Sequence, residues 1–61
     1  MPVSGSSDLV NISAKIKAET KMAFLLDDGD VTAWVPKSQV EDNRDGTFDM
    51  PEFLAYDKGF I

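Results

Sequence analysis

Apolar and polar residues alternate along the beginning of the chain with the period of two that is typical of a β-strand. Within residues 9–19 the apolar positions are Val10, Ile12, Ala14, Ile16 and Ala18, and polar residues separate them. Successive side chains of a strand point to opposite faces. This segment is therefore predicted to be a strand with one buried and one solvated face.

Two further strands are predicted on either side of a polar turn. Residues 21–26 are almost entirely apolar, which favours a central strand covered on both faces or one that curls within a small barrel. Residues 27–30, Asp-Asp-Gly-Asp, are predicted to form the turn, where Gly29 is able to adopt a positive φ. Residues 31–35 are predicted to be the third strand.

The third strand places Trp34, the single tryptophan, on the face opposite to Val31, Ala33 and Val35. If those three residues fill the core, Trp34 is exposed and available to a partner, since tryptophan is enriched at binding hot spots. If a C-terminal helix covers the other face, Trp34 is part of the core. The sequence leaves both alternatives open.

A proline and a glycine mark the breaks in the remaining β structure. Pro36 is predicted to end the third strand, because proline cannot donate to a strand ladder, and residues 37–39 are predicted to form a 3₁₀ turn. Residues 40–41 resume an extended path. The Asp-Gly pair within residues 44–46 predicts a hairpin, whose returning strand contains residues 47–48.

The chain is predicted to end in a short helix. Asp49 is positioned to cap it, and Glu52 follows three residues later, as in a capping box. Gly59 suits a left-handed C-terminal cap, after which Phe60 and Ile61 are expected to fold back. A helix this short is not stable alone, so it must pack on the β layer.

Residues 33–41, Ala-Trp-Val-Pro-Lys-Ser-Gln-Val-Glu, are similar to the closing part of an SH3 domain. There a strand ends at a proline, a 3₁₀ turn follows and a last strand begins at a valine. The resemblance implies a barrel-like fold but not polyproline binding, because the acidic loop and aromatic residues used for it are not recognisable. The predicted fold is a small curved antiparallel sheet or SH3-like barrel of three to five strands with one short C-terminal helix. Residues 9–61 form the domain, and residues 1–8 are expected to be a flexible lead-in.

Residues 14–61 also resemble a set of short bacterial and phage proteins. The similarity rests on Trp-Val-Pro-Lys-Ser-Gln at residues 34–39, Asp-Gly-Thr-Phe at residues 45–48 and Pro-Glu-aromatic-Leu-Ala at residues 51–55. The resemblance implies a phage or prophage accessory protein and supplies no mechanism.

The chain of 61 residues contains no cysteine and no histidine. Disulfides and cysteine-based metal sites are therefore excluded, and the commonest general base is missing. So short a chain hardly builds a deep catalytic pocket, and we predict a binding protein without a cofactor rather than an enzyme. The absence of a membrane-length apolar run and of a recognisable signal peptide makes the cytoplasm the expected location, that of the host if a phage encodes the protein.

Charge is distributed unevenly along the chain. The formal net charge is −5, and nine of the eleven acidic residues lie within residues 27–61 beside three basic ones. Such a surface favours a basic protein partner over the phosphate backbone of nucleic acids. The leading hypothesis is a phage-type accessory protein that binds a protein partner and inhibits a host enzyme through its acidic surface. The candidate binding residues are Trp34, Asp27, Asp28, Asp30, Glu41 and Asp42.

Three alternatives come from other features of the chain. A nucleic-acid-binding module would use Lys15, Lys17 and Lys21 with the nearby aromatic residues Phe24 and Trp34, as single-strand binders do. A structural subunit would pair its sheet edge with a second copy and form a homodimer.

The third alternative is a calcium-binding module, because residues 41–52 are similar to an EF-hand loop. Asn43, Asp45, Asp49 and Glu52 fall at its third, fifth, ninth and twelfth positions, with Gly46 at the sixth. Glu41 stands where the motif has aspartate, and a predicted strand replaces the entering helix. A hairpin with an acidic tip explains the same residues without a metal.

Overall fold

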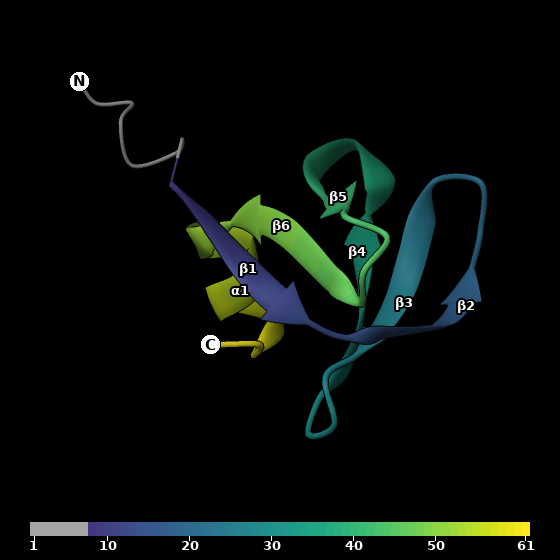
Figure 1. Ribbon diagram of the computed structural model, residues 1–61, viewed down its shortest axis with the longest axis horizontal. Helices are drawn as coiled ribbons and strands as arrows, with labels where there is room; N and C mark the ends of the chain where they lie inside the picture. The colour runs from purple at the N-terminus through teal and green to yellow at the C-terminus, as the bar shows by residue number, and fades with distance from the viewer. Residues whose placement is uncertain (1–7) are drawn as a thin grey trace.

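A computed structural model shows two three-stranded antiparallel sheets and one C-terminal helix (Figure 1), and it describes residues 8–61. The elements in chain order are β1 Leu9–Ser13, β2 Lys15–Glu19, β3 Ala23–Asp27, β4 Thr32–Pro36, the 3₁₀ turn η2 Lys37–Gln39, β5 Glu41–Asp42, β6 Thr47–Pro51 and α1 Glu52–Lys58. The predicted class, a small antiparallel β structure with one C-terminal helix, is confirmed. The lead-in expected at residues 1–8 lies, except for Asp8, outside the described residues.

The predicted first strand is divided into β1 and β2 at Ala14. Ala14 is buried, and its backbone N–H donates to the Gly46 carbonyl at 3.1 Å. On either side of it the extended chain belongs to different sheets, in the orders β1-β6-β5 and β2-β3-β4. The described chain therefore has six strands instead of three to five, and its two sheets do not close into a barrel.

Both sheets and the helix contribute to one hydrophobic core. Its buried residues are Ile12, Ala14, Leu26, Val35, Phe48, Met50, Leu54, Ala55 and Phe60. The rings of Phe24 and Phe48 connect the sheets, with centroids 5.9 Å apart. The Lys37 ammonium lies 4.9 Å from the Phe24 ring centroid and also pairs with Glu19, so it covers this contact at the surface.

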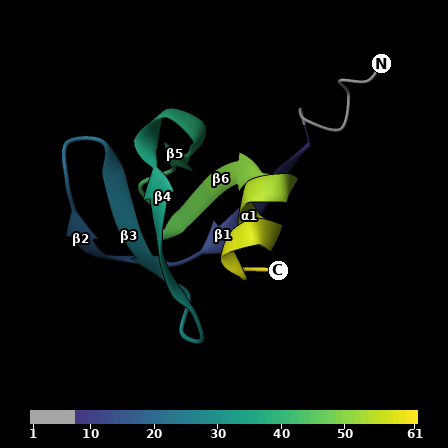
Figure 2. The ribbon, with the colours of Figure 1, turned by 180° about the vertical axis from the view of Figure 1, so that it is seen from behind.

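Strand β3 occupies the centre of its sheet, as predicted, but its outer face is only partly covered. Leu26 is completely buried, whereas Ala23 and Leu25, which alternate with it, are only partly buried. The expectation that residues 21–26 are covered on both faces is therefore wrong for the outer face of β3. The reason is that α1 packs on β1 and β6 of the other sheet (Figures 1 and 2).

The helix begins at Glu52 without the predicted capping box. Pro51 is the N-cap residue and makes no side-chain capping bond, while Asp49 lies within β6 and accepts a 2.8 Å hydrogen bond from the Asn11 side chain. Pairing with β1 extends β6 through Pro51, which removes Asp49 from the capping position. Neither α1 nor η2, the helices of residues 8–61, is long and apolar enough to cross a membrane.

The C-terminal cap of the helix is the predicted one. Gly59 has a φ of 87°, and its N–H donates to the Tyr56 carbonyl at 3.1 Å. The next N–H, that of Phe60, donates to the Ala55 carbonyl at 2.8 Å, which completes a Schellman motif. Phe60 folds back into the core as expected, whereas Ile61 stays 53% exposed.

Candidate protein-binding site

The outer face of sheet β2-β3-β4 carries a row of apolar side chains centred on Trp34. Trp34 lies opposite Leu25 on β3, and Leu25 lies opposite Ala18 on β2. Ala33 and Val35 alternate with Trp34 along β4 and pack in the core, so Trp34 points away from it. Its side chain is 45% exposed, so the alternative with an exposed tryptophan is the one the structure adopts.

The apolar row continues toward the end of β4. Ala23 lies opposite Pro36, and both share the outer face with Leu25 and Trp34. Beside this end, the turn between β2 and β3 holds Met22, which is 72% exposed. The surface formed by Ala18, Ala23, Leu25, Trp34 and Pro36 is hereafter the Trp34 face.

The other end of the Trp34 face meets the acidic turn, residues 27–30. Asp27 shares the outer face with Leu25, and its carboxylate accepts the Gly29 N–H at 2.8 Å. Lys17 lies 3.9 Å from Asp27, a long and partly exposed pairing that leaves the turn acidic as a whole. Three of the predicted binding residues besides Trp34 are therefore brought to one end of the same sheet.

Asp28 orders this turn by accepting two backbone hydrogen bonds. The N–H groups of Val31 and Asp30 donate to its carboxylate at 2.7 and 2.8 Å. These bonds, that from Val31 foremost, favour the charged form and hold the pKa of Asp28 below its ordinary value of 3.8. The same two hydrogen bonds therefore stabilise both the conformation of the turn and the charged form of Asp28.

Replacing Asp28 with asparagine tests this coupling. The amide oxygen still accepts both N–H bonds but cannot titrate. Because the folded-state pKa of Asp28 is lowered, its stabilisation is complete above its ordinary value and is lost as pH falls through the folded value. We expect wild type to be the more stable at pH 7, and the difference in unfolding midpoint to shrink below about pH 4. Urea unfolding across this range measures it, with Asp30→Asn as control; a difference independent of pH would contradict the assignment.

Glu41 and Asp42 do not belong to the same surface as Trp34. They form β5 in sheet β1-β6-β5, where Glu41 lies opposite Asp49. The Asp42 carboxylate accepts the Arg44 N–H at 2.8 Å, within a hairpin that places Arg44 at a φ of 63°. The sequence placed these two acids in one candidate site with Trp34 because both belong to the acidic part of the chain. In the structure they belong to the other sheet.

The residues of the nucleic-acid alternative are also divided. Phe24 faces inward and contacts Phe48 and Lys37, whereas Trp34 faces outward, so the two rings do not form one stacking surface. Lys15 lies opposite Asp27, which also approaches Lys17. Lys21 lies in the turn before β3. The expected combination of a basic strip beside paired aromatic rings is therefore not present in residues 8–61.

The residues of the calcium alternative are distributed over the β5–β6 hairpin, strand β6 and the start of α1. Asp45 accepts bonds from the side chain and backbone of Thr47, which lower its pKa, and Asn43 donates to the Thr47 hydroxyl at 3.1 Å. Asp49 bonds Asn11 across the sheet, and Glu52 is exposed on α1. Within residues 8–61 no group of three or more acidic side chains is arranged to hold a metal ion.

The helix α1 carries two exposed aromatic residues. Phe53 and Tyr56 are 58% and 74% exposed, although a short helix has to pack its apolar residues on the β layer to be stable. Only Leu54 and Ala55 of this helix are buried. The short length of α1 was the available signal, because two turns bury only a narrow stripe.

Comparison with known proteins adds no relative. No protein-family model matches the chain, and neither a curated protein nor a solved structure is significantly similar to it. A functional interpretation therefore depends on the surfaces of the molecule.

Proposed function

We propose that this chain is a non-enzymatic binding protein whose Trp34 face docks on a protein partner. The observation that carries the proposal is the exposure of the single tryptophan at the centre of an uncovered sheet face. A small domain gains stability by burying large apolar side chains. Leaving its tryptophan 45% exposed is a cost for the free chain that binding of a partner would offset.

The acidic turn at one end of the Trp34 face indicates the chemistry of the partner. The partner would place apolar side chains on Trp34 and Leu25, and basic ones beside residues 27–30. Complementary charge steers such an encounter and sets its specificity. Together with the resemblance to short phage proteins, this favours an accessory protein that inhibits an enzyme of the host cell by occupying a basic surface.

Trp34→Ala is the variant that tests this function. Affinity capture from the cell that makes or hosts the protein is compared between wild type, Trp34→Ala and the control Gln39→Ala, at an exposed position beside the other sheet. We expect a captured protein that Trp34→Ala loses and Gln39→Ala retains. Because Trp34 is the only tryptophan, adding the purified partner is also expected to shift its fluorescence to shorter wavelength. Absence of specific capture, or capture unaffected by Trp34→Ala, would contradict the proposal.

The acidic contribution is tested separately by replacing Asp27 and Asp28 with asparagine and Asp30 with serine. These changes keep side-chain acceptors in the turn and remove its charge. We expect weaker capture that is less sensitive to salt. Capture equal to that of wild type would exclude an electrostatic role for the turn.

A further inference from the structure

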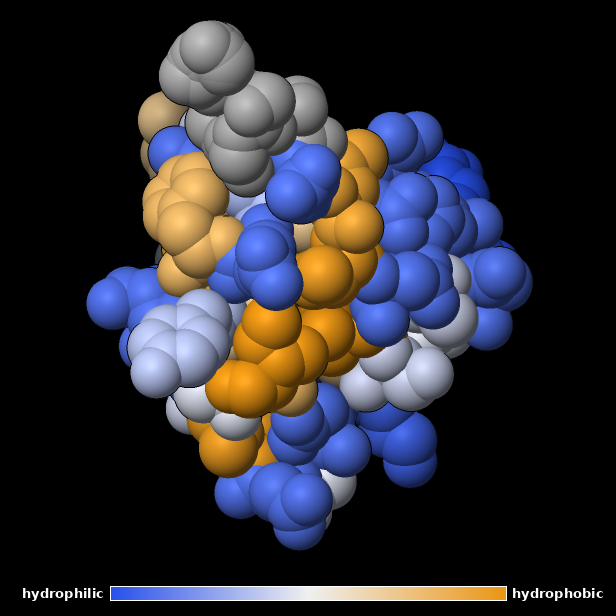
Figure 3. All heavy atoms as spheres, turned by 90° about the vertical axis from the view of Figure 1, so that its left-hand side faces the viewer, coloured by the Kyte–Doolittle hydropathy of each residue, from blue (hydrophilic) through white to orange (hydrophobic). Residues whose placement is uncertain are grey.

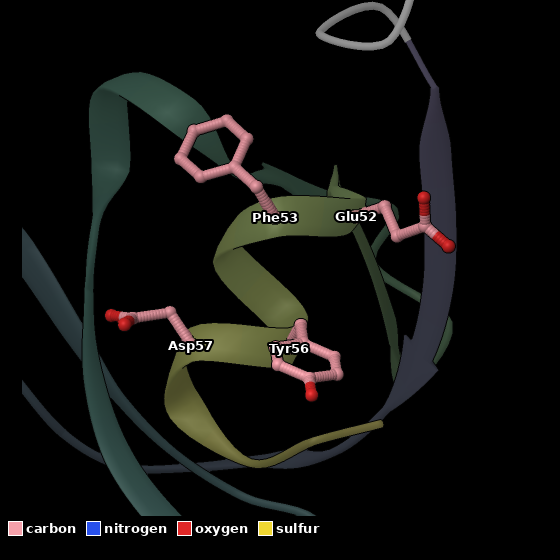
Figure 4. A pocket seen from close by; sticks show the side chains of 4 residues that line it. All are labelled: Glu52, Phe53, Tyr56 and Asp57. Atoms are coloured by element: carbon pink, nitrogen blue, oxygen red, sulfur yellow. The ribbon is translucent and has the colours of Figure 1, made fainter.

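A second exposed surface lies on α1, on the other side of the molecule from β2 and β3 (Figures 1 and 2). Glu52, Phe53, Tyr56 and Asp57 line a shallow hollow there (Figure 4). Phe53 and Tyr56 are three positions apart, so their rings lie on one side of the helix. Glu52 and Asp57 point to opposite sides, with the two rings between them. These four residues are hereafter the α1 surface.

The stability of the chain does not explain this combination. Both rings are more than half exposed, and alanine is the better helix former at exposed helical positions. Among the described residues the ion pairs are Lys17 with Asp27 and Lys37 with Glu19, so neither Glu52 nor Asp57 has a cationic partner there. The α1 surface thus presents two aromatic faces and two carboxylates that form no ion pair with residues 8–61.

Apolar surface adjoins these rings. Figure 3 shows apolar atoms gathered in a strip along the side of the molecule that carries α1, β1 and the C-terminus. The exposed apolar residue that follows the helix here, besides the rings, is Ile61 at 53%. A ligand of the α1 surface would therefore meet both negative charge and apolar surface.

We propose that the α1 surface binds a basic segment of a protein partner. Arginine or lysine side chains would lie over the rings of Phe53 and Tyr56, within reach of Glu52 and Asp57, and an apolar side chain of the segment would contact Ile61. Cations are attracted to aromatic faces, and arginine stacks on them especially well. A second copy of this chain fits less well, because its net charge of −5 would place like charges together. This site does not rest on the Trp34 face.

The test is an amide NMR titration of the full chain with a short peptide in which arginine alternates with leucine. A peptide with glutamine in place of arginine is the control probe. We expect shifts concentrated at residues 52–57 and Ile61 with the arginine peptide, weakened by added salt, and little response to the glutamine peptide. Shifts confined to β3 and β4 would overturn this inference while leaving the Trp34 face supported.

Variants in which acidic side chains are replaced by their amides distinguish binding at the α1 surface from a general attraction of the basic peptide to the acidic protein. Glu52→Gln with Asp57→Asn is compared with Asp30→Asn with Glu41→Gln, which removes the same charge elsewhere. We expect the first pair to weaken peptide binding about fivefold, as for two exposed ion pairs, and the second less than twofold. Phe53→Ala with Tyr56→Ala should also weaken binding, with the fold verified by circular dichroism. Equal weakening by both charge pairs would overturn the proposal.

Discussion

Replacing Phe48 with alanine is expected to remove half or more of the free energy of unfolding of the protein. Phe48 is 3% exposed, lies opposite Ile12 and contacts the ring of Phe24 in the other sheet. Truncating a buried phenylalanine costs about 3–5 kcal/mol, because apolar contact is lost and a cavity remains. At about 0.05–0.15 kcal/mol per residue, a chain of this length has only about 3–9 kcal/mol of stability in total.

Urea unfolding followed by Trp34 fluorescence measures this effect. Phe48→Leu keeps most of the buried volume and should retain the fold with a smaller loss of stability. Phe53→Ala is the control, because it is the same change from phenylalanine to alanine at a site that is 58% exposed. We expect it to change the free energy of unfolding by less than about 1 kcal/mol. A Phe48→Ala variant as stable as Phe53→Ala would contradict the core described above.

Replacing Gly59 with valine is expected to have the next largest effect, a loss of about 1–2 kcal/mol. The φ of 87° at Gly59 is in the left-handed region, which costs side chains with a Cβ about this much. The first side-chain carbon is not itself obstructed, since a Cβ at this position would lie 3.8 Å from the Val31 methyl carbons, an ordinary contact. The penalty of adding a Cβ therefore comes from the backbone.

Thermal unfolding of Gly59→Val and Gly59→Asn separates backbone strain from other causes. Asparagine tolerates the left-handed region better, so the Gly59→Asn variant should be the more stable of the two. A strained cap would also weaken the return of Phe60 into the core, and amide exchange at Phe60 should become faster. Equal stability of the two variants would contradict an effect of φ.

The sequence was sufficient to predict where most of the strands lie and that Trp34 and Val35 occupy opposite faces of the third strand. The structure shows which face is inside, since Val35 is completely buried and Trp34 is exposed. The sequence did not predict the division at Ala14, because the alternation continues unbroken through the point where the chain changes sheets. Only the partners of the two strands define that point: β1 pairs with the distant β6, and β2 with the neighbouring β3.

The start of the helix and the exposure of Trp34 both depend on pairings that are remote in sequence. The local pattern around Asp49 and Glu52 matches a capping box, but the pairing of β6 with β1 extends the strand through Pro51. Whether Trp34 is covered depends on which sheet the helix packs against. Local patterns carry no information on that choice, so the sequence left open whether Trp34 is exposed or buried.

One extended segment, residues 9–19, passes through both sheets, and the two sheets differ in the loop-closure entropy that their formation costs. The meander β2-β3-β4 joins near neighbours, whereas the pairing of β1 with β6 joins residues as distant as Asn11 and Asp49. Closing longer loops costs more conformational entropy. The Trp34 face thus stands on the locally paired half of the chain, and the α1 surface stands on the half that forms only when the two ends of the chain meet.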